Sequence, residues 1–328
     1  MKMMNLLKYM QILSFVLPVA FLSCSNDTIE DVHYTPQTKI GQKLLAGSET
    51  VARVYTDTSF VVALGVTETD VHFQKADSRS THIFIIDIDL NEPGVSLEIG
   101  MPYDADVRNN FQRQTLTEMA DYADRPWHRV AAMINADFWD VSTMDIRGPI
   151  HRNGVILKNS FIFKETLPQQ ALSFIALTKD NKMVIADSVE YRGMQYNLKE
   201  VTGSGVIVLR DGEISGATYP GIDPRTCLGY SDDGHVYFMV ADGRVEFYSY
   251  GLTYPEMGSI MKALGCSWAV NLDGGGSTQM LIRHPIADIF QIRNRPSDGQ
   301  ERPVVNTWMG TAAADGDVCS DRGGVEKR

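Results

Sequence analysis

Cysteine and histidine are scarce in this sequence. The 328 residues contain four cysteines and seven histidines, and the histidines form no cluster. If Cys24 is modified, Cys227, Cys266 and Cys319 remain, an odd number without metal-ligand spacing. Cys227 and Cys266 lie in apolar runs, which is typical of buried free thiols. The sequence therefore indicates neither a disulfide framework nor a transition-metal hydrolytic site rich in histidine.

Familiar glycine-rich nucleotide loops are also absent. The main glycine-rich stretch, residues 267–280, reads S-W-A-V-N-L-D-G-G-G-S-T-Q-M. It lacks the lysine of the G-x-x-x-x-G-K-[ST] loop, and it does not have G-x-G-x-x-G spacing. Any anion that this stretch binds would be held in a different way.

Positive charge is in the minority. Lys and Arg number 30 against 41 Asp and Glu, a net charge of −11, and loss of residues 1–23 would remove Lys2 and Lys8. An acidic surface argues against nucleic acid as a partner. A small anionic ligand is still compatible with an acidic surface, because a few arginines in one place outweigh the net negative charge locally.

The first residues are typical of a bacterial lipoprotein signal. Residues 1–23 contain Lys2, Lys8, an apolar run from Ile12 to Leu22 and no acidic residue. Cys24 then stands where such a signal is cleaved and lipidated, although Phe21 replaces the usual Leu. We expect an extracytoplasmic protein, lipid-anchored to a bacterial membrane. The expected order is signal peptide (1–23), tether (24–47), folded domain (48–315) and polar tail (316–328).

Strands outnumber helices in the rest of the chain. Residues 48–101 alternate apolar and polar positions with turn residues between the runs, and residues 171–177 and 183–186 add two further strands. Helices are predicted at 115–122 and 253–264. The second has a capping box in T-Y-P-E and a glycine stop at Gly265. Tight hairpins are predicted at Asn153-Gly154, Asp211-Gly212 and Asp233-Gly234. We predict an α+β fold with a mixed, largely antiparallel sheet and a few packed helices.

The glycine stretch follows an apolar strand whose last polar residues share one face. Alternation places Asn271 and Asp273 on the same side of the strand. Three consecutive glycines are costly unless the backbone needs positive φ or something approaches it closely. Successive N–H groups there, with two hydroxyls after them, are able to form an anion-binding concavity. The alternative is a plain connector. The residues concerned are Gly274, Gly275, Gly276, Ser277 and Thr278.

Other polar residues stand at strand ends. Asn135 and Asp137 follow a buried strand, and side-chain caps of a turn are the alternative explanation for both. Antiparallel pairing of the strands on either side of Asp233-Gly234 brings Arg225 and Arg244 to one edge, where two guanidinium groups suit a phosphate. Arg225 is equally able to pair with Asp242. We expect His151 to be structural.

Four separated elements resemble the phosphodiester glycosidase family, in family order and over residues 60–314. They are N-L-D-G-G-G-S-T with the preceding E-M-G-S-I-M-K-A-L-G, the P-R-T-x-x-G and D-G-R pair, N-A-D-F-W, and R-P with a following Asn. The family includes a lysosomal enzyme that removes N-acetylglucosamine from a phosphodiester on mannose. The resemblance implies hydrolysis of a glycosyl phosphodiester, with release of a sugar such as N-acetylglucosamine from a phosphorylated glycan.

Site residues follow from the resemblance. It implies Asp273 and Glu256 as catalytic carboxylates, although the capping box already explains Glu256. The substrate-binding residues it implies are Asn135, Asp137, Arg225, Asp242, Arg244, Asn271, Gly274, Gly275, Gly276, Ser277, Thr278, Arg302 and Asn306. No cofactor is expected. Two alternatives stay open: a non-catalytic glycan-binding lipoprotein, and a metal-assisted phosphodiesterase in which Asp137, Asp242 and Asp273 hold Mg²⁺ or Ca²⁺.

Overall fold

The computed structural model describes residues 34–215 and 221–313. The predicted signal peptide, Cys24, the first part of the predicted tether and the predicted polar tail lie outside these residues, as does Cys319. Within the described ranges, no helix has the length and apolar character needed to cross a membrane.

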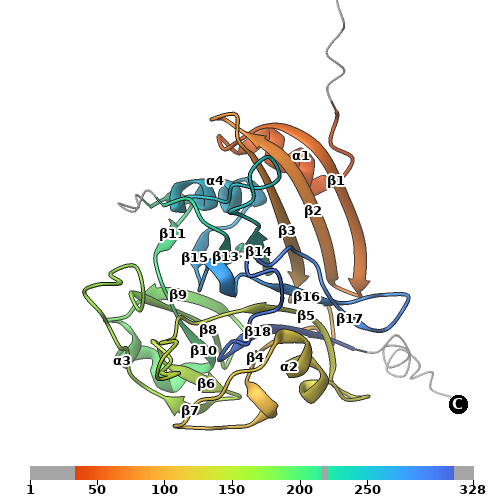
Figure 1. Cartoon of the computed structure of the whole chain (residues 1–328). Helices are drawn as coiled ribbons and strands as arrows, with labels where there is room; N and C mark the ends of the chain where they lie inside the picture. Colours follow the sequence, from red (N-terminus) through yellow and green to blue (C-terminus); the bar gives the residue numbers. More distant parts are fainter. Residues whose placement is uncertain (1–33, 216–220, 314–328) are drawn as a thin grey trace, which may run out of the picture. The chain divides into compact units, whose positions relative to one another are not determined.

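Three antiparallel sheets make up the folded unit (Figure 1). The largest has eight strands in the order β1 (Val51–Ala63), β2 (Val66–Lys75), β3 (Ser80–Asp89), β14 (His235–Ala241), β13 (Arg225–Tyr230), β15 (Trp268–Asn271), β11 (Ile207–Arg210) and β12 (Glu213–Ile214). The second has the order β17 (Phe290–Ile292), β16 (Met280–Arg283), β5 (Arg129–Asn135), β18 (Thr307–Ala312) and β4 (Ser96–Gly100). The third has the order β7 (Val155–Lys158), β6 (Ile150–Arg152), β10 (Leu198–Ser204), β8 (Ser173–Thr178) and β9 (Met183–Asp187). The predicted α+β class is confirmed.

Four α-helices and three 3₁₀ turns accompany the sheets in the described part of the chain. The helices are α1 (Lys39–Gly47), α2 (Leu116–Ala123), α3 (Tyr191–Met194) and α4 (Tyr254–Leu264). The turns are η1 (Pro102–Asp104), η2 (Gln195–Asn197) and η3 (Gly275–Ser277). Both α2 and α4 begin with a capping box, at Thr115 and Thr253, and α4 ends at Gly265 with φ of 101°. The cap and the glycine stop of α4 are those that the sequence predicted, and α2 lies one residue after the predicted range 115–122.

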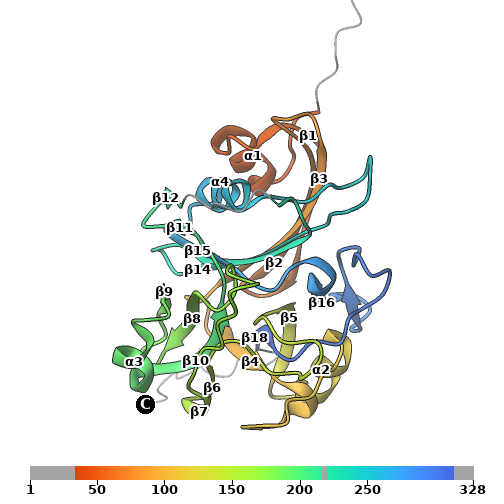
Figure 2. The same cartoon turned by 60° about the vertical axis from the view of Figure 1, so that its left-hand side comes forward.

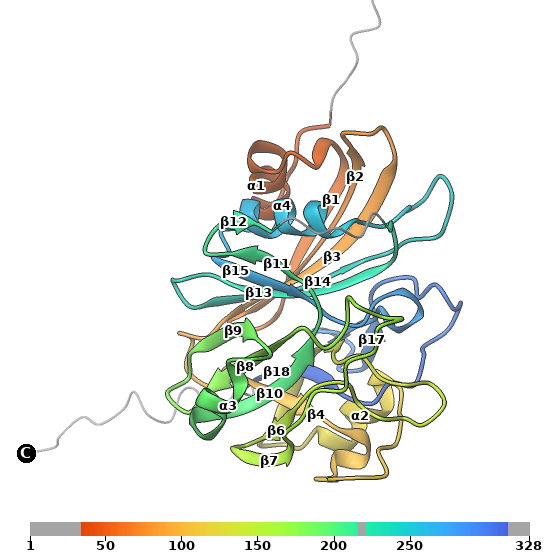
Figure 3. The ribbon, with the colours of Figure 1, turned by 90° about the vertical axis from the view of Figure 1, so that its left-hand side faces the viewer.

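The central strands of the eight-stranded sheet are buried on both faces. Along β3, Ile83 and Ile85 pack toward α1 and α4, whereas Phe84, Ile86 and Ile88 pack with apolar residues of the other two sheets. This explains the nearly continuous apolar run of β3. In a strand that is covered on both sides, no position faces solvent and polar residues are not needed. Figures 2 and 3 show α1 and α4 on one side of this sheet and the strands of the two smaller sheets on the other.

The predicted tether is wrong for its second half. Residues from Tyr34 onward are folded against the domain, and α1 lies beside α4. Leu44 of α1 is fully buried, and the Asp57 carboxylate accepts hydrogen bonds from the Tyr34 hydroxyl (2.7 Å) and the Thr38 backbone N–H (2.7 Å). A helix as short as α1 cannot be recognised in the sequence of a polar stretch, because only its docking on β1 and α4 makes it stable.

The two smaller sheets are joined through buried polar contacts. The indole N–H of Trp308 in β18 donates to the Thr202 hydroxyl in β10 (2.8 Å), and Trp308 is fully buried.

Both cysteines in the described ranges, Cys227 and Cys266, are buried free thiols, as their apolar surroundings in the sequence predicted.

Candidate active site at the ends of β5 and β15

The polar residues at the ends of β5, β13 and β15 are brought together by one asparagine. Asn135, at the end of β5, donates through Nδ2 to the backbone carbonyl of Asp273 (2.6 Å). Its Oδ1 accepts from the Thr226 hydroxyl (2.8 Å) and from the backbone N–H of Gln279 (3.1 Å). Asn135 is 1% exposed. Its side chain therefore fixes the backbone on both sides of the glycine stretch.

Asp273 is the carboxylate at the centre of this arrangement. Burial raises its pKa to about 6, while the Ser277 hydroxyl, the Arg302 guanidinium, the Gly274 N–H and the Trp139 indole favour the ionised form. The residue is half-buried, so the carboxyl group is still reachable from solvent. A carboxylate with a raised pKa and several donors directed at it is typical of a catalytic site. We call Trp139, Asp273, residues 274–278 and Arg302 the strand-end site.

The glycines have a steric reason to be glycines. Gly275 has φ of +61°, and a methyl group there would lie 3.1 Å from the Arg244 guanidinium. A methyl group on Gly276 would overlap the guanidinium of Arg302. The turn is thus shaped for the close approach of two arginines, which a plain connector does not need.

The expected concavity of free backbone N–H groups is largely closed. Gly275 N–H donates to the Pro224 carbonyl (2.9 Å), and the N–H groups of Ser277 and Thr278 donate within the turn at 3.2 Å each. Backbone donors are therefore used to hold the turn, and an anion would meet the arginine side chains instead.

Arg302 and Arg244 flank the turn with part of each guanidinium exposed. Arg302 donates from Nε to Asp298 (2.7 Å) and from Nη1 to the Ser277 hydroxyl (3.4 Å), and its side chain is 33% exposed. Arg244 donates from Nη2 to Asp223 (2.9 Å) and its side chain is 52% exposed. Both retain donors for a ligand.

Arg225 and Arg244 lie at the same edge, as expected, because both are within 3.9 Å of the Asp223 carboxylate. The predicted β13–β14 pairing is confirmed, with Arg225 opposite Ala241. However, the Arg225 side chain is buried, stacks 4.3 Å from the centre of the Tyr254 ring, and donates to the carbonyls of Leu252 (3.0 Å) and Gly221 (2.6 Å). It holds the segment before α4 in place, and little of it faces a ligand.

Asp242 is also structural in this arrangement, and it does not pair with Arg225. Its oxygens accept from Asn294 Nδ2 (3.0 Å), the Tyr248 hydroxyl (2.9 Å) and the Arg295 N–H (3.0 Å). Burial raises its pKa, and these three donors act in the opposite direction. No group of three His, Cys, Asp or Glu side chains in the described residues is placed to hold a metal, so Asp137, Asp242 and Asp273 do not form such a set.

Glu256 is committed to the start of α4. Its Oε2 accepts from the Thr253 N–H (2.7 Å) and hydroxyl (3.0 Å), and Oε1 accepts from the ammonium of Lys75 (3.0 Å). Lys75 is 1% exposed, and Glu256 is the nearer of its two negative partners, the other being Asp77 at 3.6 Å. The structure therefore argues against the catalytic role expected for Glu256, because both oxygens already have structural partners.

Four buried polar atoms on the predicted site residues have no hydrogen-bond partner in the described structure. They are Asp137 Oδ1, Asn271 Oδ1, Thr278 Oγ1 and Asn306 Nδ2. Most buried polar atoms in proteins are paired, so unpaired ones mark places for water or a ligand. Their location on residues chosen from the sequence supports a polar binding site around the glycine turn.

Asp137 is the one carboxylate among these four residues, and it is buried. Its Oδ2 accepts from the N–H groups of Gly148 (2.9 Å) and Gly203 (3.1 Å), and its own N–H donates to Asn306 Oδ1 (3.0 Å). Burial raises its pKa to about 7, opposed mainly by the charge of Lys158. A methyl group on either glycine would overlap the carboxylate.

Some contributors were not predicted. Trp139 lies in the N-A-D-F-W element but is not among the predicted site residues. Gln279 and Asp298 are identified only by their contacts with Arg302, at 3.0 Å and 2.7 Å. His151 is structural as expected: it is fully buried, bonds the Tyr191 hydroxyl (2.6 Å), and burial lowers its pKa to about 4.

Two solved structures share the fold of this chain. The catalytic domain of zebrafish N-acetylglucosamine-1-phosphodiester alpha-N-acetylglucosaminidase, auto-inhibited by its pro-peptide, superposes with a TM-score of 0.57 at 17% identity, covering 77% of this chain and 87% of that one. A hypothetical protein from Synechocystis superposes with a TM-score of 0.55 at 12% identity, covering 76% of this chain and 62% of that one. These likenesses show the fold.

Sequence comparison adds the family. The SPbeta prophage-derived uncharacterized protein YomE of Bacillus subtilis is 38% identical over 84 residues, which are 26% of this chain and only 12% of that protein. The phosphodiester glycosidase family model matches residues 128–310, more than half of the chain, including the strand-end site. This chain belongs to the phosphodiester glycosidase family.

Proposed function

We propose that this protein hydrolyses a glycosyl phosphodiester at the bond between the anomeric carbon and oxygen, releasing a sugar such as N-acetylglucosamine. The observation that carries the proposal is the position of Asp273, whose carboxylate lies beside the glycine turn, where the Ser277 hydroxyl and the charge of Arg302 favour its ionised form. Membership of the family supports the reaction class.

Asp273 acts at the anomeric carbon in this proposal. The Asn135 hydrogen bond to its backbone carbonyl (2.6 Å) fixes the main chain from which the carboxylate projects. With a pKa raised to about 6, the group is ionised at neutral pH and still basic enough to take a proton. It serves either as the nucleophile or as the base that activates water, the two roles open to such a carboxylate in glycoside hydrolysis.

Arg302 and Arg244 receive the phosphate. Each has a guanidinium group beside the turn and partly open to solvent, and neither is neutralised on all sides. Positive groups fixed in advance where negative charge develops lower the barrier without reorganisation during the reaction. A phosphomonoester is already a good leaving group, so this electrostatic help matters more than protonation of the departing oxygen.

In this proposal the sugar reaches the unpaired polar atoms, which are buried in this structure. Asn271 Oδ1 and Thr278 Oγ1 lie on either side of the turn, and Asn306 Nδ2 lies on the residue that also accepts the Asp137 N–H. An acceptor, a hydroxyl and a donor together match the hydroxyl and amide groups of an N-acetylated sugar.

Hydrolysis in ¹⁸O-labelled water tests the proposal. The purified protein is incubated with N-acetylglucosamine-1-phosphodiesters, and both products are analysed by mass spectrometry. We expect the label on the sugar and loss of turnover in Asp273→Asn, while Asp180→Asn, an exposed control (69%), keeps wild-type turnover. Label in the phosphate identifies a phosphodiesterase instead, and absence of turnover on every phosphodiester supports a non-catalytic glycan-binding role.

We further propose that the protein acts outside the cytoplasm, held to a membrane by lipid on Cys24. The support is in the sequence alone: Lys2, Lys8, the apolar run at 12–22 and the cysteine that follows. Labelled palmitate should be incorporated into the wild type expressed in a bacterium. A Cys24→Ser variant that incorporates as much label contradicts the anchor.

A further inference from the structure

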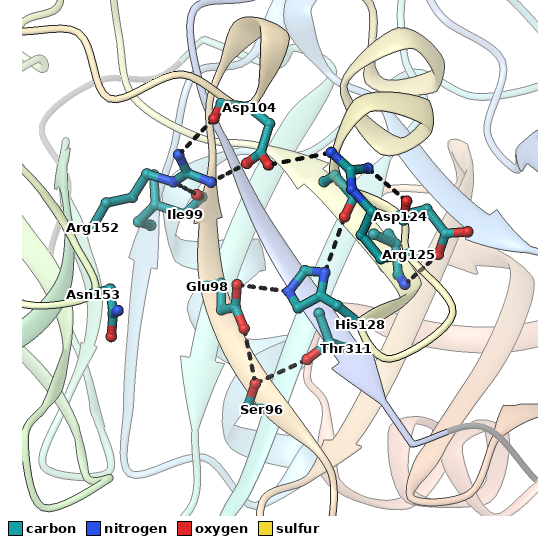
Figure 4. Close-up of polar contacts among 12 residues, drawn as sticks. Ser96, Glu98, Ile99, Asp104, Asp124, Arg125, His128, Arg152, Asn153 and Thr311 are labelled. Carbon is teal, nitrogen blue, oxygen red and sulfur yellow. Dashed lines mark hydrogen bonds and ion pairs between the residues drawn. The ribbon is translucent and has the colours of Figure 1, made fainter. Parts of the chain in front are cut away.

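A second polar groove lies away from the strand-end site. It has a volume of about 520 Å³ and shares no residue with that site. Its walls are β4, the segment after α2 and the β6–β7 hairpin, as Figure 4 shows for Glu98, His128 and Arg152. This volume is in the range of small-molecule sites in proteins.

Most of the charges of this groove have a neighbour of opposite sign. His128 contacts the Glu98 carboxylate through Nε2 (2.9 Å) and the Ala123 carbonyl through Nδ1 (3.0 Å), as Figure 4 shows. Both partners are acceptors, so both ring nitrogens carry protons and the histidine is a cation. Its charge is balanced by Glu98.

The arginines are balanced in the same way. Arg152 donates to Asp106 (2.8 Å) and to both the carboxylate and the carbonyl of Asp104. Arg125 lies 3.8 Å from the other oxygen of Asp104. A strongly charged ligand would have to displace these partners, so the groove does not favour one.

Three side chains of the groove make no hydrogen bond with the described residues. The Asn153 side chain makes no hydrogen bond with the described residues, the Lys199 ammonium makes no direct hydrogen bond although its charge is balanced by Glu98 and Glu200, and Trp127 is 81% exposed without a packed neighbour ring. An exposed tryptophan is unusual unless something covers it, because its large apolar face remains in water. The amide and ammonium groups supply hydrogen bonds next to that face.

We propose that this groove binds a neutral sugar residue of a glycan. A pyranose ring has an apolar face of C–H groups that packs flat against an indole, and hydroxyls around its edge for Asn153 and Lys199. Few other ligand classes combine an apolar face, many hydrogen-bonding groups and no charge. The groove is an additional glycan-binding site, and the inference does not depend on the reaction proposed above.

Titration calorimetry tests the inference with the whole folded protein. The probes are neutral tetrasaccharides of glucose, mannose and N-acetylglucosamine. At least one should bind, with affinity lowered about tenfold or more in Trp127→Ala and also lowered in Lys199→Ala. Tyr196→Ala is the matched control, because Tyr196 is 74% exposed and lies outside the groove. Asp273→Asn should bind as the wild type does.

A second readout locates the sugar. The bound tetrasaccharide should protect tryptophan fluorescence from acrylamide in the wild type, in Tyr196→Ala and in Asp273→Asn, since Trp127 is the most exposed tryptophan of the described chain. Binding unchanged in Trp127→Ala, binding lost in Asp273→Asn, or no binding of any neutral probe would each overturn the inference. Binding only of acidic oligosaccharides would overturn it as well.

Discussion

Asn135 holds the backbone carbonyl of Asp273 by a 2.6 Å hydrogen bond from a fully buried amide. This one contact joins the end of β5 to the residue that carries the proposed chemistry, 138 positions later in the chain. The site is therefore supported by a side chain that itself has no need to touch substrate.

Asn135→Asp should disturb the site, although the two side chains have nearly the same shape. The new oxygen in place of Nδ2 would face the Asp273 carbonyl, while the acceptor for Thr226 and Gln279 is kept. We expect a loss of about 2–4 kcal/mol of stability and a kcat lowered at least about tenfold at temperatures where the variant is folded. Thr226→Val, which removes only one donor, is the control. Equal kcat in the two variants would contradict this role.

Asp273→Asn should stabilise the fold at neutral pH. Because burial raises the folded-state pKa from 3.8 to about 6, the folded state holds a proton that the unfolded state has released between these values. The wild type therefore loses stability as pH rises through this window, by at most about 3 kcal/mol and less with partial exposure. Melting of both proteins at pH 3.5, 5 and 7.5 measures it. A difference that does not grow with pH would count against the raised pKa.

Gly276→Ala should weaken substrate binding. The added methyl group overlaps the Arg302 guanidinium, which must then leave its place beside the turn. We expect KM to rise by about tenfold or more, since one charge-assisted contact to phosphate is lost. Gly193→Ala is the matched control, because a methyl group there meets nothing within 4 Å. If both variants have wild-type KM, Arg302 does not contact the substrate.

Glu256→Gln should cost stability and leave turnover intact. The amide keeps an acceptor for Thr253 but leaves the ammonium of Lys75, 1% exposed, with only the more distant Asp77 (3.6 Å) as a negative partner. We expect a loss of about 1–3 kcal/mol and a kcat near that of the wild type. The double variant Lys75→Met with Glu256→Gln should recover part of that stability, because no unpaired charge stays buried. A kcat lowered a hundredfold in a well-folded Glu256→Gln protein would instead support a catalytic role for Glu256.

Local features of the fold follow from the sequence alone. The boundaries of α2 and α4 are set by capping boxes and Gly265, and the Asn153-Gly154 and Asp233-Gly234 turns define their hairpins, because each depends on residues adjacent in the chain. The glycine turn and the carboxylate before it were equally visible, since three consecutive glycines have few uses other than close approach.

Partners distant in the chain were decided only by the tertiary structure. The strand pairing predicted from the sequence allowed an ion pair between Asp242 and Arg225. In the fold the Asp242 carboxylate accepts hydrogen bonds from Asn294 and Arg295 instead. Glu256 meets Lys75, 181 positions away, and this contact converts an expected catalytic group into a helix cap with a buried ion pair. The sequence by itself determined which residues are polar, where strands end and where the backbone needs glycine. Which of those polar groups face each other depends on how three sheets pack, and no local pattern encodes that packing.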